Sequence, residues 1–247
     1  MQIPQARTNG RIDQIMERAS KALVRRDYFE SERLASEALG LAMSTGDFER
    51  AARIALPLQE SRRMIRDMAF DTRSVHVIDS SPPKGREIRP GMYLIAPPRV
   101  GVEGRLLRED ALSHDVPVIV LVREPTTREG LWPVVAVGPV TIRSKVRPPA
   151  ASKRRVRGGA VAVEPVPTPE WFISTSEHLG DLAISGVPAG ASGPMRVLAL
   201  YDRLCAIPDH EKLHQRFAEA AHAVVKGARA KPRRAHAAAY GGRAVED

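Results

Sequence analysis

The first seventy residues carry one pattern twice: small and apolar side chains recur every three or four positions after two similar turns. Residues 26–31 open one such segment, and residues 46–51 open the next one twenty residues later. Apolar residues at this spacing form a stripe along an α-helix, and another element must cover that stripe. The pattern predicts helices over residues 11–24 and 28–44. We expect the third helix to kink or break at Pro57, because proline cannot donate the next ladder hydrogen bond.

The same segment resembles the tetratricopeptide repeat over residues 11–56. The matching positions are the small and turn residues of that family: Ala19, Ala22, Asp27, Tyr28, Ser31, Ala35, Ala38 and Leu39. That repeat recurs about every 34 residues, whereas the two turns here lie 20 residues apart, so we expect one hairpin and a following helix. An ordinary helical bundle with alanines at close crossings is the alternative. The resemblance implies a groove for another protein, lined from Ile12, Ile15, Tyr28 and Phe29.

The rest of the chain changes character twice, and together the segments predict an α+β fold. After residue 72, β-branched runs separated by Pro and Gly indicate strands of a small mixed or antiparallel sheet, with one short helix over 103–113. Helices resume after residue 169, and we expect them to cover one face of the sheet. The expected segments are a helical one at 1–72, a β-rich domain at 73–147, a basic Pro-rich linker at 148–169, C-terminal helices at 170–226 and a disordered basic tail at 227–247.

One pattern near the C-terminus argues for an enzyme: residues 210–214 read His-Glu-Lys-Leu-His. This resembles the His-Glu-x-x-His motif of zincin metalloproteases, in which two histidines on one helix face hold zinc and the glutamate activates water. By that resemblance His210 and His214 would be metal ligands and Glu211 the base of a zinc-dependent hydrolase. The flanks argue against it. Pro208 marks a helix start, the positions of the metzincin pattern hold Phe217 and Ala220, and a glutamate at the thermolysin-like distance would have to be Glu246 in the expected tail. The alternative is a pair of partly buried histidines beside an apolar helix stripe.

A second alternative function follows from the net charge of +9. Most of this charge lies in the expected linker and tail, in the runs Lys153–Arg157 and Arg229–Arg234, which could neutralise phosphates. Aromatic side chains, on which nucleic-acid bases stack, make up only 4% of the chain, and none lies within residues 153–157. Nucleic-acid binding through these segments would therefore be non-specific.

Several other classes of protein lack support in the sequence. The chain has neither the glycine-rich phosphate-binding motifs nor the nucleophile elbow of serine hydrolases. Cys205 is the single cysteine, so no intramolecular disulfide can form. No secretory signal and no apolar run long enough for a bilayer is visible, so we expect a cytoplasmic protein. We also expect no cofactor. The main hypothesis is a non-enzymatic adaptor or scaffold that binds another protein.

Overall fold

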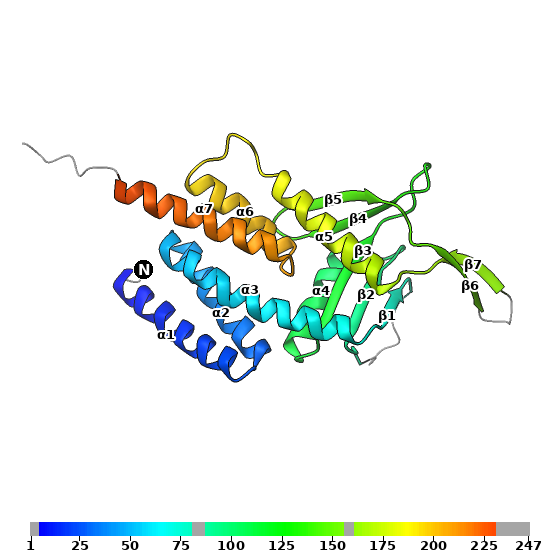
Figure 1. Cartoon of the computed structure of the whole chain (residues 1–247), viewed down its shortest axis with the longest axis horizontal. Coiled ribbons are helices and arrows are strands. Elements are labelled where there is room, and N and C mark those ends of the chain that lie inside the picture. The colour runs from blue at the N-terminus through cyan, green and yellow to red at the C-terminus, as the bar shows by residue number, and fades with distance from the viewer. Residues whose placement is uncertain (1–4, 81–86, 156–160, 231–247) are drawn as a thin grey trace, which may run out of the picture.

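The computed structural model describes residues 5–80, 87–155 and 161–230. They form an α+β fold in which helices from both ends of the chain pack beside a mixed sheet, as expected (Figure 1). None of the helices in these ranges combines the length and the apolar character needed to cross a membrane.

The N-terminal helices follow the two turns that the sequence marks. They are α1 (Gln5–Val24), α2 (Tyr28–Ser44) and α3 (Phe48–Asp71). Asp27 and Asp47 cap α2 and α3 by accepting hydrogen bonds from backbone N–H groups three residues later. Gly46 lies between these two helices and adopts a left-handed backbone conformation, with φ of 68°, which is typical of the residue that follows a helix end.

Of the kink or break expected at Pro57, the break is wrong, because α3 runs through this residue. Proline removes one ladder hydrogen bond, but the neighbouring Ile54 and Leu58 are buried in the helical core. This burial on both sides of the proline holds the helix together across the missing bond.

The first and last helices share one hydrophobic core. It is built from α1, α2 and α3 together with α6 (Pro194–Ala206) and α7 (Glu211–Ala230). Helix α3 packs against α2 and also along α7. The N-terminal helices are therefore covered by the C-terminal pair.

The sheet has five strands in the order β1-β2-β3-β4-β5, which is also their order in the chain. Strands β1, β2 and β3 are parallel, and β4 and β5 continue the sheet in antiparallel fashion, so the sheet is mixed. The bounds are β1 Val75–Ile78, β2 Gly91–Ile95, β3 Val118–Arg123, β4 Trp132–Val137 and β5 Thr141–Val146.

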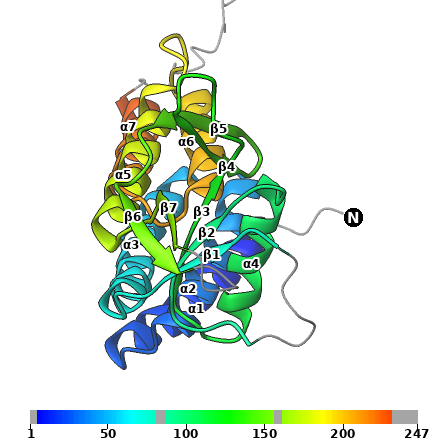
Figure 2. The same cartoon turned by 90° about the vertical axis from the view of Figure 1, so that its right-hand side faces the viewer.

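Helices lie on both faces of this sheet, as Figure 2 shows. Helix α5 (Pro169–Ser185) covers one face, where Phe172 and Leu179 share a core with Met92 of β2 and Ala69 of α3. The expectation that C-terminal helices cover a sheet face is thus confirmed. Helix α4 (Gly101–Ser113) packs on the other face through residues such as Ala111.

The segment 148–169, expected as a linker, contains a separate two-stranded antiparallel sheet. Its strands are β6 (Ala151–Arg155) and β7 (Val161–Pro165), and they project from the body of the molecule (Figure 1). Helix α7 ends at Ala230, four residues later than predicted, and residues 231–247 of the expected tail lie outside the described residues.

Candidate functional site

The groove expected on the N-terminal hairpin does not have the predicted lining. Ile12 is fully buried and Ile15 is 6% exposed, and both belong to the core that the helices share. Tyr28 and Phe29 are half-buried at the start of α2. The prediction that these isoleucines line an open groove is wrong, since an apolar stripe in a sequence shows that a helix face is covered but not which element covers it.

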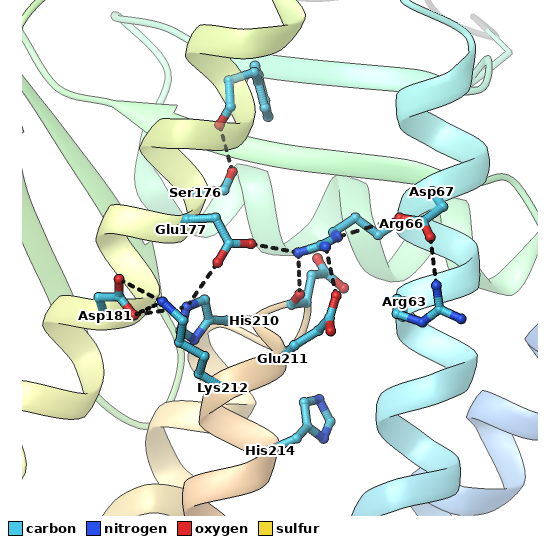
Figure 3. A network of polar contacts seen from close by, with 12 residues as sticks. Arg63, Arg66, Asp67, Ser176, Glu177, Asp181, His210, Glu211, Lys212 and His214 are labelled. Carbon is cyan, nitrogen blue, oxygen red and sulfur yellow. Dashed lines mark hydrogen bonds and ion pairs between the residues drawn. The ribbon is translucent and has the colours of Figure 1, made fainter.

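The two histidines of the zincin-like motif diverge in the structure. His210 precedes the first residue of α7, whereas His214 lies within the helix. The imidazole of His210 packs on Gly180 of α5. The Nε2 atom of His214 lies 2.9 Å from the backbone oxygen of Pro208, so this nitrogen carries the proton and donates it. His214 points to the α3 side of α7 (Figure 3).

The glutamate of the motif is engaged elsewhere. One carboxylate oxygen of Glu211 accepts a hydrogen bond from Nη2 of Arg66 at 2.8 Å. Among residues 5–80, 87–155 and 161–230, no group of three or more His, Cys, Asp or Glu side chains is placed to hold a metal ion. The structure thus brings Glu211 to a guanidinium rather than to a site that His210 and His214 share.

Arg66 of α3 is the centre of a polar network that joins three helices (Figure 3). Its Nη1 atom donates to Glu177 of α5 at 2.7 Å, and its Nη2 atom donates to Glu211 of α7. Only 17% of the Arg66 side chain is exposed. Nearby, Lys212 and Asp181 form an ion pair of 3.1 Å between α7 and α5. The network joins the C-terminal part of α3 and the start of α7 to the middle of α5.

His210 lies inside this network, between Glu177 and Asp181 of α5. Its side chain is 2% exposed, and neither ring nitrogen makes a hydrogen bond within the described part of the chain. The nearest carboxylate oxygens to Nε2 are Oε2 of Glu177 at 3.4 Å and Oδ1 of Asp181 at 3.5 Å. The Nε2 atom thus lies at ion-pair distance from two carboxylates, and this interaction with His210 is the largest cause that lowers the pKa of Glu177.

Burial sets the protonation state of His214. Burial is the largest cause, and together with the positive charge of Arg62 on α3 it lowers the pKa of the imidazole to about 3. The hydrogen bond to Pro208 and the charge of Asp209 act in the opposite direction without reversing the effect. His214 is therefore neutral in the folded protein at neutral pH.

A cavity of about 140 Å³ lies beside the network, in the gap between β3 and β4. The two strands pair only at Val122 with Val135 and at Arg123 with Val134, so they diverge towards the start of β3. We call this space the β3–β4 cavity. Its walls are mainly apolar, and the charged or titratable side chains among them come from the network and its surroundings: Arg66, Arg105, Arg108, Glu109, Glu177, Asp209 and His210.

A second hollow opens on the α4 face of the sheet, with a volume of about 520 Å³. We call it the α4–β1 groove. Its apolar lining comes from β1, the segment before β2, β2 and α4: Ile78, Ile88, Tyr93, Ile95, Leu106 and Leu107. Its charged rim consists of Glu87, Arg99, Glu103 and Asp110. Leu106 is 52% exposed, so part of this apolar surface faces solvent.

The basic runs expected to contact phosphates are only partly described. Residues 153–155 form part of β6, while residues 156–157 and 231–234 lie outside the described residues. The guanidinium of Arg229 is 70% exposed and lies 3.0 Å from the carboxylate of Glu49. Nucleic-acid binding therefore stays a prediction.

Sequence reasoning singled out the histidines and missed the arginines that organise the site. Arg66 reaches Glu211 across 145 residues, and Arg108 reaches Asp209 across 101 residues. No local sequence pattern predicts such pairs. A buried arginine does, however, require an acidic or hydrogen-bonding partner. No protein-family model, curated protein or solved structure matches this chain.

Proposed function

We propose that this protein is a non-enzymatic adaptor that binds an extended segment of a partner protein in the α4–β1 groove. The observation that carries the proposal is the groove itself, a hollow of about 520 Å³ with an apolar lining and a charged rim. The occupant is a β-strand with apolar side chains at alternate positions and basic residues between them. Three features of the groove support this occupant.

The first feature is apolar surface on α4. Val102 and Leu106 are one helical turn apart, and they are 38% and 52% exposed. Val100, at the start of the same helix, is 57% exposed. Single exposed apolar residues are ordinary on a protein surface, but several beside a hollow are typical of an interaction site.

The second feature is the position of β1 at the edge of the sheet. An edge strand can pair with a strand from another chain, whose backbone supplies affinity while alternate side chains enter pockets. Ile78 of β1 lines the groove. A strand added beside β1 would therefore direct every second side chain towards the groove.

The third feature is the charge of the rim. Among the residues that the structure describes, Glu87, Glu103 and Asp110 contribute carboxylates to the rim, whereas Arg99 contributes a cation that is already paired with Glu103. This described part of the rim is net negative. Lysine or arginine in the partner segment would complement it and would disfavour acidic competitors.

A peptide-display selection on the purified full chain tests this function. Peptides that also bind the Leu106→Asp variant are removed, because a carboxylate at this position would place a charge in the apolar lining. We expect the surviving peptides to alternate apolar residues with Lys or Arg. Synthetic versions should bind the wild-type chain at least about tenfold more tightly than Leu106→Asp.

The matched control is Leu56→Asp. Leu56 lies on α3 away from the groove and is 67% exposed, so the same substitution there should leave peptide affinity unchanged. The proposal fails if no peptide distinguishes the Leu106 variant, if the selected peptides are acidic, or if both variants weaken binding equally.

A further inference from the structure

We infer that the outer edge of β5 binds an acidic β-strand of another protein, with aspartate or glutamate at every second position. Strand β5 forms one edge of the five-stranded sheet, and β1, which lines the α4–β1 groove, forms the opposite edge. The inference is therefore independent of the proposed function, which concerns a basic segment at the β1 edge.

Three basic residues stand at alternate positions along this edge. Arg143 and Lys145 belong to β5, and Arg147 directly follows it. Ile142, which alternates with them, is buried in the core that α5 covers, so the basic side chains project from the opposite face of the sheet. Helix α4 packs on β2, β3 and β4 of that face, and all three basic residues are exposed.

The charge of this row is only partly neutralised by the described part of the chain. The guanidinium of Arg143 donates to both carboxylate oxygens of Glu124, at 2.8 and 2.6 Å, and its side chain is 54% exposed. The charge of Lys145 reaches Glu129 without forming an ion pair. Arg147 likewise forms no ion pair with a residue that the structure describes. An acidic partner would therefore complement the row.

The backbone of the same residues is directed outward. The carbonyl of Pro133 in β4 accepts a hydrogen bond of 2.8 Å from the N–H of Glu124, so it faces β3. Neighbouring residues of an antiparallel strand direct their backbone groups to opposite sides, so the next residue of β4 faces β5 and bonds with its partner Ser144. The N–H and C=O groups of Arg143 and Lys145 therefore point away from β4, and no described residue forms a further backbone hydrogen bond with them.

These outward groups set the register of an added strand. An antiparallel strand beside β5 would exchange backbone hydrogen bonds with Arg143 and Lys145. The two residues directly opposite would lie two positions apart and direct their side chains to the same face as the two cations. Carboxylates there would form favourable cross-strand pairs, whereas lysine or arginine would be repelled. The backbone oxygen of Arg147 already accepts a hydrogen bond from Trp171, so only its side chain contributes.

A peptide fits this edge better than a nucleic acid does. Phosphate groups would pair with the cationic side chains, but a sugar–phosphate backbone offers no regular row of donors for the carbonyls of Arg143 and Lys145. A β-strand supplies donors, acceptors and acidic side chains at the same two-residue spacing.

Fluorescence anisotropy with labelled peptides and the full chain tests this inference. The probe is Thr-Glu-Val-Glu-Val-Glu-Thr, and its control has the same composition with the glutamates in one block. We expect the alternating peptide to bind at least about tenfold more tightly. N-methylation of its glutamates should abolish binding, because their N–H groups would face β5. N-methylation of its valines, whose N–H groups would face away, should change the affinity little.

Charge reversal at Lys145 provides the second arm. Lys145→Glu should weaken binding of the alternating peptide at least about tenfold, whereas Lys226→Glu at an exposed position of α7 should not. If Lys145→Glu does not fold, the contrast between the two N-methylated peptides decides.

Several outcomes would overturn the inference. They are equal binding of the alternating and block peptides, equal effects of the two N-methylations, and unchanged affinity in a folded Lys145→Glu. Absence of peptide binding would also overturn it and would indicate that the basic row keeps the edge of β5 unpaired. An oligothymidylate that binds more tightly than the peptide would assign the row to nucleic acid instead.

Discussion

Arg108 and Asp209 form two hydrogen bonds, from Nη2 to Oδ1 at 2.7 Å and from Nε to Oδ2 at 3.2 Å. Only 19% of the arginine side chain and 21% of the aspartate side chain is exposed. Burial of the Asp209 carboxyl acts to raise its pKa, but the charge and hydrogen bonds of Arg108 outweigh this effect and keep the pKa below its ordinary value. The pair holds α4 against the turn that precedes α7.

Removing one member of this pair should destabilise the protein strongly. Arg108→Met leaves the Asp209 carboxylate without its main partner, and we expect a loss of about 3 kcal/mol in the free energy of unfolding, at the lower end of the range for buried pairs. Urea unfolding measures this loss. Arg105→Met on the same helix is the control, because Arg105 is 49% exposed and its removal should cost less than about 0.5 kcal/mol. Equal losses in the two variants would contradict a structural role for the pair.

His214 should make stability depend on pH. Its pKa is about 3 in the folded protein because of burial and the charge of Arg62, against 6.5 for an unperturbed histidine. The unfolded chain therefore binds a proton that the folded chain excludes, so stability is highest above pH 6.5 and falls as the pH drops towards 3. Between pH 7 and pH 5 this histidine should account for a loss of about 2 kcal/mol.

Substitution of His214 isolates that contribution. His214→Gln keeps a donor for the Pro208 carbonyl but cannot titrate, so its urea unfolding should lose about 2 kcal/mol less than wild type between pH 7 and pH 5. His222→Gln, on an exposed position of α7, should retain the wild-type pH dependence. A wild-type slope in His214→Gln would show that another group causes the pH dependence.

The order of elements could be predicted because local patterns specify it. Residues 92–95 are apolar without alternation, which is typical of a strand buried on both faces, and β2 lies between two strands with helices on either side. The aspartates at positions 27 and 47 likewise predict helix starts. In both cases a few adjacent residues carry the whole signal.

Long-range contacts could not be predicted in the same way. The stripe that contains Ile12 predicts a buried face, but it does not reveal that α6 and α7 complete the shared core. The spacing of His210 and His214 implies one helix face only if both residues are helical, and His210 precedes α7. The partners of Arg66 come from distant parts of the chain, so only the folded arrangement identifies them.

Gly180 should be required where α5 meets His210. A Cβ atom there would lie 2.2 Å from Cγ and Cδ2 of the imidazole, so Gly180→Ala should cost about 1–3 kcal/mol through overpacking. In a His210→Ala background, where the imidazole is absent, Gly180→Ala should cost less stability than it does in the wild-type chain. Gly40→Ala in α2 has open space around the new methyl group and should stabilise by about 0.4–1 kcal/mol. Thermal unfolding compares these variants, and no difference between positions 180 and 40 would contradict the packing argument.

Metal removal should leave the protein unchanged. The rings of His210 and His214 diverge, and Arg66 holds Glu211. A zinc ion bound at this motif would contribute several kcal/mol to folding, so dialysis against a chelator would then lower the melting temperature and release zinc. We expect an unchanged melting temperature and a zinc content far below one per chain by elemental analysis. Near-stoichiometric zinc that is lost in His214→Gln would instead restore the hydrolase hypothesis. It would mean that the start of α7 rearranges, since only then could the two imidazoles bind one metal ion.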